Sequence, residues 1–193
     1  MPAPCSTSWR SRRGWCRKQG EQVAGQPATE SIPRIAITQQ LFDAFLVCQT
    51  KCWLRAANEA PTGNTYAEWA ACRSDTFRAE GIKRLVRERA EGETAVAPAV
   101  DKLKSANWLL AVDVSAQAAA VETRIAAIER VPSAGRGKAA QFVPIRFAWP
   151  NKLSQHEKRL LAFDALALSE TLDRNVPVGK IIHGDDHATI KVT

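Results

Sequence analysis

The sequence contains no apolar run as long as the roughly 18 residues that a membrane-spanning helix needs. It also lacks the apolar stretch that follows the basic start of a secretory signal, because Trp9, Trp15 and Cys16 stand among charged and polar residues. We therefore expect a soluble protein without a membrane partner.

Cysteine is scarce, with five residues and none after Cys72. An odd, unevenly placed set is a poor disulfide framework and indicates a reducing compartment, so we expect a cytoplasmic protein. Cys48 and Cys52 stand four residues apart, which on one helix puts both thiols on the same face. Such a pair supplies two metal ligands, but a zinc or iron–sulfur site needs about four. No second pair follows, so the sequence favours buried thiols.

Basic residues are in modest excess over acidic ones, and much of this excess lies at the N-terminus. The chain has 27 Lys and Arg against 20 Asp and Glu, a net charge of +7. Residues 1–34 hold six basic and two acidic residues and show no sustained apolar periodicity. We expect a disordered basic leader over 1–34 and one domain over 35–193, since about 100–200 residues form one compact domain.

The composition of this leader leaves its role open. A solvated leader is the simplest interpretation, although its arginines also suit nucleic acid or an anionic membrane surface. Its first 20 residues are rich in Arg and Ser and poor in acids, as in a mitochondrial presequence. A true start downstream of Met1 would account for the composition equally well.

Two helices are predicted in the first half of the domain. Thr38 caps the first, which reaches Leu54 with apolar residues at spacings of three and four. Thr65, with Glu68 three residues later, forms a capping-box pattern that opens the second. Basic residues of the second helix suit an ordinary charged face or contacts with phosphates. The candidates for nucleic-acid contacts are Arg73, Lys83, Arg84 and Arg87.

Beyond Glu93 the pattern changes to short apolar segments typical of strands. Ser154 and Glu157 form another capping box, which opens a strongly apolar helix. The expected strands are 108–114, 119–131 and 142–147 before this helix, and 180–183 and 188–192 after it. This order predicts an α/β (α+β) fold in which helices flank a mixed sheet.

The same order, with particular residues, resembles the RecB-type branch of the PD-(D/E)XK nucleases, which includes the CRISPR-associated RecB-like exonucleases. Residues 37–54 read ITQQLFDAFLVCQTKCWL and are similar to the family's opening helix, which has a central Phe and a Cys-containing turn before an aromatic–Leu pair. Residues 122–147 and 160–192 are similar to the family's core in the same order. The resemblance implies a restriction-endonuclease-like fold over 35–193, and residues 1–34 have no counterpart in it.

Nucleases of this family are metal-dependent DNA hydrolases. An Asp on one strand, and an acid and a Lys two residues apart on the next, hold Mg²⁺ or Mn²⁺ and activate water. The resemblance puts Ala126 at the Asp, Arg146 at the acid and Ala148 at the Lys. The family's Gln and Tyr fall near Leu160 and Asp164. A cation at the acid position repels a metal ion, by about 4 kcal/mol for unit charges about 4 Å apart at an effective dielectric of about 20.

Acidic residues nearby provide an alternative, a DNase whose carboxylates have migrated. Asp113 and Glu122 are the best substitutes, since strand alternation puts Glu122 on the face of Ala126 and Glu129 on the other. Two residues remain to replace the missing Lys, namely Lys152 and Lys158. Ordinary surface carboxylates are the simpler interpretation.

The densest group of metal-ligand side chains is His183, Asp185, Asp186 and His187. Two His four residues apart, with acids between them, bind a transition metal if the turn folds around it. The segment also matches a hairpin turn, which is the simpler interpretation.

The resemblance further implies a 4Fe–4S cluster, held by one Cys near the first helix and three in a segment after the core. Cys48 matches the first of these ligands, and the other three are absent before Thr193. We therefore expect a truncated reading frame whose product has no cofactor of its own. We expect a fragment or degenerate member of the RecB-family nucleases, catalytically inactive alone and at most a non-specific nucleic-acid binder, with DNA as partner. The alternative is a pseudo-nuclease module that docks a partner protein or a downstream nuclease region.

Overall fold

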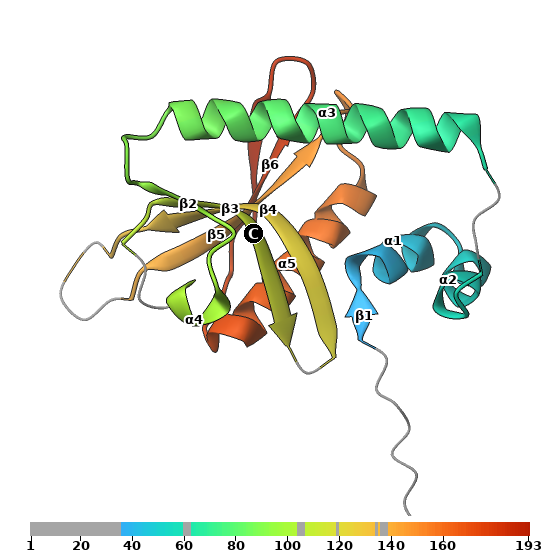
Figure 1. Ribbon diagram of the computed structural model, residues 1–193, viewed down its shortest axis with the longest axis horizontal. Helices are drawn as coiled ribbons and strands as arrows, with labels where there is room; N and C mark the ends of the chain where they lie inside the picture. Colours follow the sequence, from blue (N-terminus) through green and yellow to red (C-terminus); the bar gives the residue numbers. More distant parts are fainter. Residues whose placement is uncertain (1–35, 60–62, 104–106, 119, 134, 136–138) are drawn as a thin grey trace, which may run out of the picture. The chain divides into compact units, whose positions relative to one another are not determined.

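Strands from both halves of the domain join one mixed sheet in the computed structural model (Figure 1). The structure describes residues 36–59, 63–103, 107–118, 120–133, 135 and 139–193. The leader predicted over 1–34 falls outside them. In the described residues the sheet has seven strands and is flanked by helices, so the predicted fold class is confirmed.

The elements follow in the order β1 (Ile37–Thr38), α1 (Gln39–Val47), α2 (Gln49–Ala56), α3 (Thr65–Arg87), β2 (Thr94–Val96), α4 (Val100–Leu103), β3 (Leu110–Ala118), β4 (Val121–Val131), β5 (Gln141–Ala148), α5 (Gln155–Leu172), β6 (Gly179–His183) and β7 (Ala188–Val192). The strand order is β2-β3-β4-β5-β6-β7, and β1 pairs with β4. β3, β4 and β5 form an antiparallel meander. α5 then crosses over to β6, which runs parallel to β5, and β7 returns antiparallel.

The predicted first helix is two helices, α1 and α2. Thr38 caps α1 as expected, because its Oγ1 accepts a hydrogen bond from the Leu41 amide at 3.2 Å. Cys48 interrupts the helical backbone with φ −162° and ψ 122°. Cys48 is exposed and Cys52 only half-buried. The predictions of one helix carrying both thiols, and of buried thiols, are therefore wrong.

The two predicted capping boxes also differ from the structure. Asn64 rather than Thr65 caps α3. Its Oδ1 accepts hydrogen bonds from the backbone amides of Tyr66 and Ala67, in the first turn of the helix, at 3.0 and 3.2 Å. Ser154 precedes α5, but its side chain makes no capping hydrogen bond. Glu157 is instead bonded to Arg146 of β5.

Apolar side chains cover both faces of the sheet, with one long helix on each. On one face, α5 buries Phe163, Ala167 and Leu168 against the meander. On the other, Phe77, Ile82 and Leu85 of α3 pack on Ile145 and Phe147 of β5. The two faces are called the α5 side and the α3 side below.

The β3–β4 pair changes faces at Asp113, which has the left-handed φ of 60°. Val112 packs on the α3 side and Val114 on the α5 side, although regular alternation would give them one face. Glu129 consequently lies on the α3 side, where it pairs with an arginine just beyond α3. Ala126 also packs on the α3 side. The prediction that Glu129 and Ala126 face opposite ways is therefore wrong.

α3 approaches β5 closely at Gly81. A Cβ built there would lie 2.3 Å from Cε1 of Phe147. We expect Gly81→Val to lower the free energy of unfolding by about 2 kcal/mol, because overpacking a core costs about 1–3 kcal/mol. Urea denaturation measures this, with Gly63→Val as control, since a Cβ there is only in ordinary contact, 3.7 Å from Glu68. Equal losses in both variants would contradict the close packing.

Candidate functional site

The ladder between β4 and β5 ends at the pair Ala127–Ile145. If the antiparallel register is extended by one residue beyond this pair, Ala126 falls opposite Arg146. A cavity of about 100 Å³ opens at this point, between the two strands and the helices on either side. Its lining includes Gln39, Arg78, Arg124, Ala126, Arg146 and Asp164. The structure thus brings together two of the three positions that the resemblance assigns to catalysis, and we call this place the Arg146 cavity.

Carboxylates of α5 hold the Arg146 guanidinium. Its Nε donates to Oε2 of Glu157 at 2.8 Å, and its Nη1 lies 3.6 Å from Oδ2 of Asp164. The Arg146 side chain is 20% exposed, so water screens these ion pairs only in part. A cation supplied by the chain therefore stands at the position where the resemblance leads one to expect an acid.

Asp164 is the most buried charged side chain of the cavity, with 3% of its surface exposed. Thr123 donates its hydroxyl to Oδ1 at 2.6 Å, and Nε2 of Gln39 donates to the same oxygen at 3.2 Å. Burial raises the pKa of Asp164 to about 6, against the opposing effects of Arg146 and Thr123. The Asp164 carboxyl therefore loses its proton only near pH 6, even though the Arg146 cation lies beside it.

The other two arginines of the cavity are also paired. Nε and Nη2 of Arg124 donate to the two oxygens of Asp113. This pair of hydrogen bonds holds the pKa of Asp113 below its usual range. Arg78 lies 2.9 Å from Asp75 on the same helix. Asp113, a proposed substitute ligand, is therefore occupied by a guanidinium.

The three positions that the resemblance assigns to catalysis do not supply ligands for a hard divalent cation. Mg²⁺ and Mn²⁺ take oxygen ligands, chiefly carboxylates. Ala126 offers no such oxygen and Arg146 is itself a cation. Ala148, at the position of the family's Lys, is buried against Leu161 and Ile181. Metal-assisted hydrolysis therefore has no ligand set at these positions.

The substitute residues are not gathered into a second centre. Asp113 lies between the pairs Val112–Ala127 and Val114–Ile125, whereas Glu122 stands opposite Gln117, four positions after Asp113 on β3. That separation is roughly 13 Å, too far for two carboxylates to share one ion. The lining of the Arg146 cavity does not include Lys152 or Lys158. The hypothesis of migrated carboxylates therefore gains no geometric support.

The segment His183 to His187 is the turn between β6 and β7, as the hairpin interpretation predicts. Two side chains of the group take separate partners: His187 stacks on Phe77 of α3 with ring centroids 4.6 Å apart, and Asp185 accepts a hydrogen bond from Asn151 at 3.0 Å. Both ring nitrogens of His183 are buried and have no hydrogen-bond partner among the described residues. Asp186 is exposed. Among the described residues, no three His, Cys, Asp or Glu side chains form a group that could hold a metal ion.

The cysteines give no ligand set for an iron–sulfur cluster. Cys48 is an exposed residue at the junction of α1 and α2, where the amides of Lys51 and Thr50 lower its pKa. Cys72 lies on α3 and is exposed. Because a 4Fe–4S cluster needs about four thiolates, the three free cysteines of the described chain do not fit it.

The nucleic-acid candidates lie where the sequence predicts them, on the outer surface of α3. Arg73, Lys83, Arg84 and Arg87 are all exposed. Their spacing puts them within one side of the helix. In the part of the chain that the structure describes, none of the four forms an ion pair. They are therefore available to an anionic partner.

Sequence reasoning missed two features of the site. Asp164 lies four residues after Leu160 and four before Leu168, so the helical period is the signal that could have indicated its burial. Glu157 was assigned to a helix cap and instead binds Arg146. The ion pairs themselves join residues of different elements, and no local pattern in the sequence indicates them.

Comparisons with known proteins assign the chain to no group. No model of a protein family matches it, and no curated protein matches it either.

No helix among the described residues is both long and apolar enough to cross a membrane.

Proposed function

We propose that this domain is a catalytically inactive relative of the RecB-type nucleases that binds nucleic acid through phosphate contacts, without reading its sequence. The Arg146 cavity carries the proposal. Ala126 faces Arg146 where the β4–β5 ladder ends, and Glu157 with Asp164 neutralises the guanidinium. The order of elements from β3 to β7 agrees with the order that the resemblance leads one to expect.

Binding is assigned to the exposed cations of α3. A Lys or Arg that contacts a phosphate releases condensed counterions, which favours association irrespective of base sequence. Four such side chains on one side of a helix are enough for a weak, salt-sensitive interaction. A cytoplasmic location belongs to the same proposal, supported by Cys48, Cys52 and Cys72 as free thiols.

A cleavage assay tests the inactive part of the proposal. We expect single- and double-stranded DNA to stay intact with the protein in Mg²⁺ or Mn²⁺, because the ligand positions hold Ala126 and Arg146. Denaturing gels of end-labelled DNA provide the measurement. Robust turnover that is lost on Glu122→Ala would show a migrated active site and contradict the proposal.

A second candidate, a module that docks another protein, is favoured by exposed apolar side chains of α1 and α2. Phe45, Val47 and Trp53 are exposed by 49%, 61% and 67%. Large exposed apolar side chains mark a protein interface where they form a contiguous patch. Salt separates the two functions, because phosphate contacts weaken steeply with salt and apolar contacts do not.

A further inference from the structure

Three aromatic rings gather beside the first half of α3. Tyr66 and Trp69 belong to that helix and Trp149 follows β5. The ring centroids of Tyr66 and Trp69 are 5.8 Å apart, and those of Trp69 and Trp149 are 6.0 Å apart. Tyr66 is 71% and Trp69 51% exposed. We call these residues the aromatic patch.

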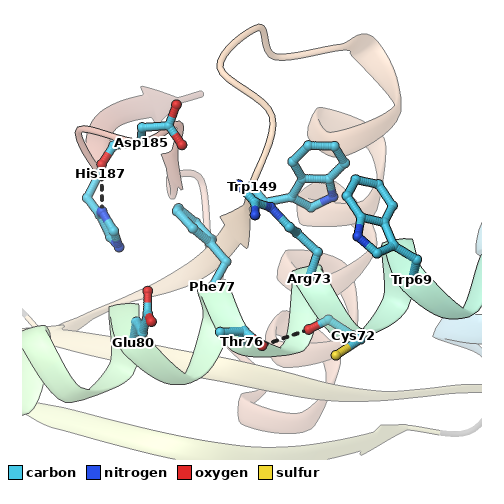
Figure 2. A pocket seen from close by; sticks show the side chains of 9 residues that line it. All are labelled: Trp69, Cys72, Arg73, Thr76, Phe77, Glu80, Trp149, Asp185 and His187. Carbon is cyan, nitrogen blue, oxygen red and sulfur yellow. Dashed lines mark hydrogen bonds between the residues drawn. The ribbon is translucent and has the colours of Figure 1, made fainter.

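The patch borders a cavity of about 360 Å³, within the roughly 300–1,000 Å³ typical of ligand sites. Figure 2 shows Trp69, Arg73 and Phe77 rising from α3 toward Trp149 and the β6–β7 turn. The Arg73 guanidinium carbon is 6.0 Å from the centre of the Trp149 ring. The aromatic rings of Trp69 and Trp149 and the guanidinium of Arg73 therefore line the same cavity.

One residue that lines the cavity also has a buried polar atom without a partner. The ring of His187 stacks on Phe77, and its Nδ1 lies 3.3 Å from the backbone oxygen of Asp185. Its Nε2 is buried and has no hydrogen-bond partner among the described residues. Such an atom costs free energy unless a ligand or water satisfies it.

The aromatic patch continues into the cations of α3. Tyr66, Trp69, Arg73, Arg84 and Arg87 are separated by three, four or eleven residues, which keeps them on one side of the helix. At about 1.5 Å per residue this stripe is roughly 30 Å long. Its first half is aromatic and its second half cationic.

We propose that this stripe binds single-stranded nucleic acid, with bases stacked on Trp69 and Trp149 and phosphates on the basic residues beyond them. The inference rests on the proposed function and adds the class of substrate. Aromatic platforms beside a cationic track are the way proteins hold unpaired strands, since every base has a π face. Bases within a duplex are already stacked and do not offer that face.

The Arg73 guanidinium favours this occupant over a purely apolar one, although the carboxylates of Glu80 and Asp185 also line the cavity. An apolar protein segment would leave the Arg73 guanidinium without a polar partner, at a cost in desolvation. A nucleotide supplies a phosphate for that guanidinium.

Fluorescence anisotropy of end-labelled oligonucleotides tests the proposal on the full chain. The probes are an oligo-dT of about 12 nucleotides and a duplex of equal length, both at low salt. We expect the wild type to bind the single strand more tightly than the duplex. Trp69→Ala should weaken single-strand binding about tenfold, because one stack contributes that order of affinity, and should change duplex binding less than about twofold.

Trp53→Ala is the matched control, since Trp53 is equally large and 67% exposed but lies on α2. It should leave both affinities unchanged, and Trp69→Phe should retain part of the single-strand affinity. Circular dichroism establishes that each variant is folded.

The outcomes separate this inference from the function on which it rests. Nucleic-acid binding that is unaffected by Trp69→Ala, or equally tight for the duplex, overturns the stacking site and leaves the proposed function standing. Absence of any binding by the wild type overturns both. Self-association that Trp69→Ala abolishes, without an effect on oligonucleotide binding, makes the patch an interface between copies of the chain and overturns the inference.

Discussion

Replacement of Arg146 by leucine is expected to lower the free energy of unfolding by about 3 kcal/mol at neutral pH, because removing one partner of a buried ion pair costs about 3–5 kcal/mol. Glu157 and Asp164 keep 22% and 4% of their side-chain surfaces exposed, so both carboxylates would lose their cation while largely shielded from water. The partial exposure of Glu157 puts the loss at the lower end of that range. Urea denaturation followed by circular dichroism measures it.

Arg84→Leu is the control for this substitution, because Arg84 is exposed and forms no ion pair within the described chain. A surface change of this kind should alter the free energy of unfolding by less than about 0.5 kcal/mol. Arg146→Lys keeps the positive charge but cannot contact Glu157 and Asp164 through separate nitrogens. It should therefore lower the free energy of unfolding by an amount between those of the other two variants. Equal losses for Arg146→Leu and Arg84→Leu would mean that Arg146 does not neutralise the site.

Asp164→Asn is expected to remove a pH dependence of stability. The pKa of Asp164 rises from 3.8 to about 6 in the folded protein. Between these values the folded state binds more protons than the unfolded state, so stability falls as pH rises through that window. The loss is on the order of 3 kcal/mol, at about 1.4 kcal/mol per pH unit.

The measurement is the difference in free energy of unfolding between Asp164→Asn and the wild type, at about pH 4 and about pH 7.5. Asparagine resembles the protonated carboxyl, so the variant should gain on the wild type as pH rises. Asp113→Asn should act in the opposite sense, because Arg124 lowers the pKa of Asp113 and its contribution is lost only as pH falls. A constant difference for Asp164→Asn would contradict the raised pKa.

The sequence predicted the elements that carry strong local patterns. The apolar segment of β5, the periodic residues of α5 and the turn residues between β6 and β7 each gave a correct element. β1 and β2 were missed because they have only two and three residues and owe their existence to parallel pairing with distant strands. The break at Cys48 carries no Gly or Pro, so nothing local marked it.

The site was predictable only in part. The resemblance put Ala126 and Arg146 at neighbouring functional positions, and the structure gives them one cavity. The change of face at Asp113 depends on a left-handed backbone that the sequence did not indicate, and it reversed the orientation assigned to Glu129. The aromatic patch joins Trp69 to Trp149, 80 residues later, through tertiary packing alone.

The salt dependence of oligonucleotide binding tests the central claim most directly, because a domain that binds phosphates must release counterions. In the presence of EDTA, we expect the logarithm of the wild-type affinity for oligo-dT to fall linearly with the logarithm of salt. The slope should be about −2 to −3, as for three or four phosphate contacts on a single strand. No binding at about 20 mM salt, or an affinity independent of salt, would contradict the account.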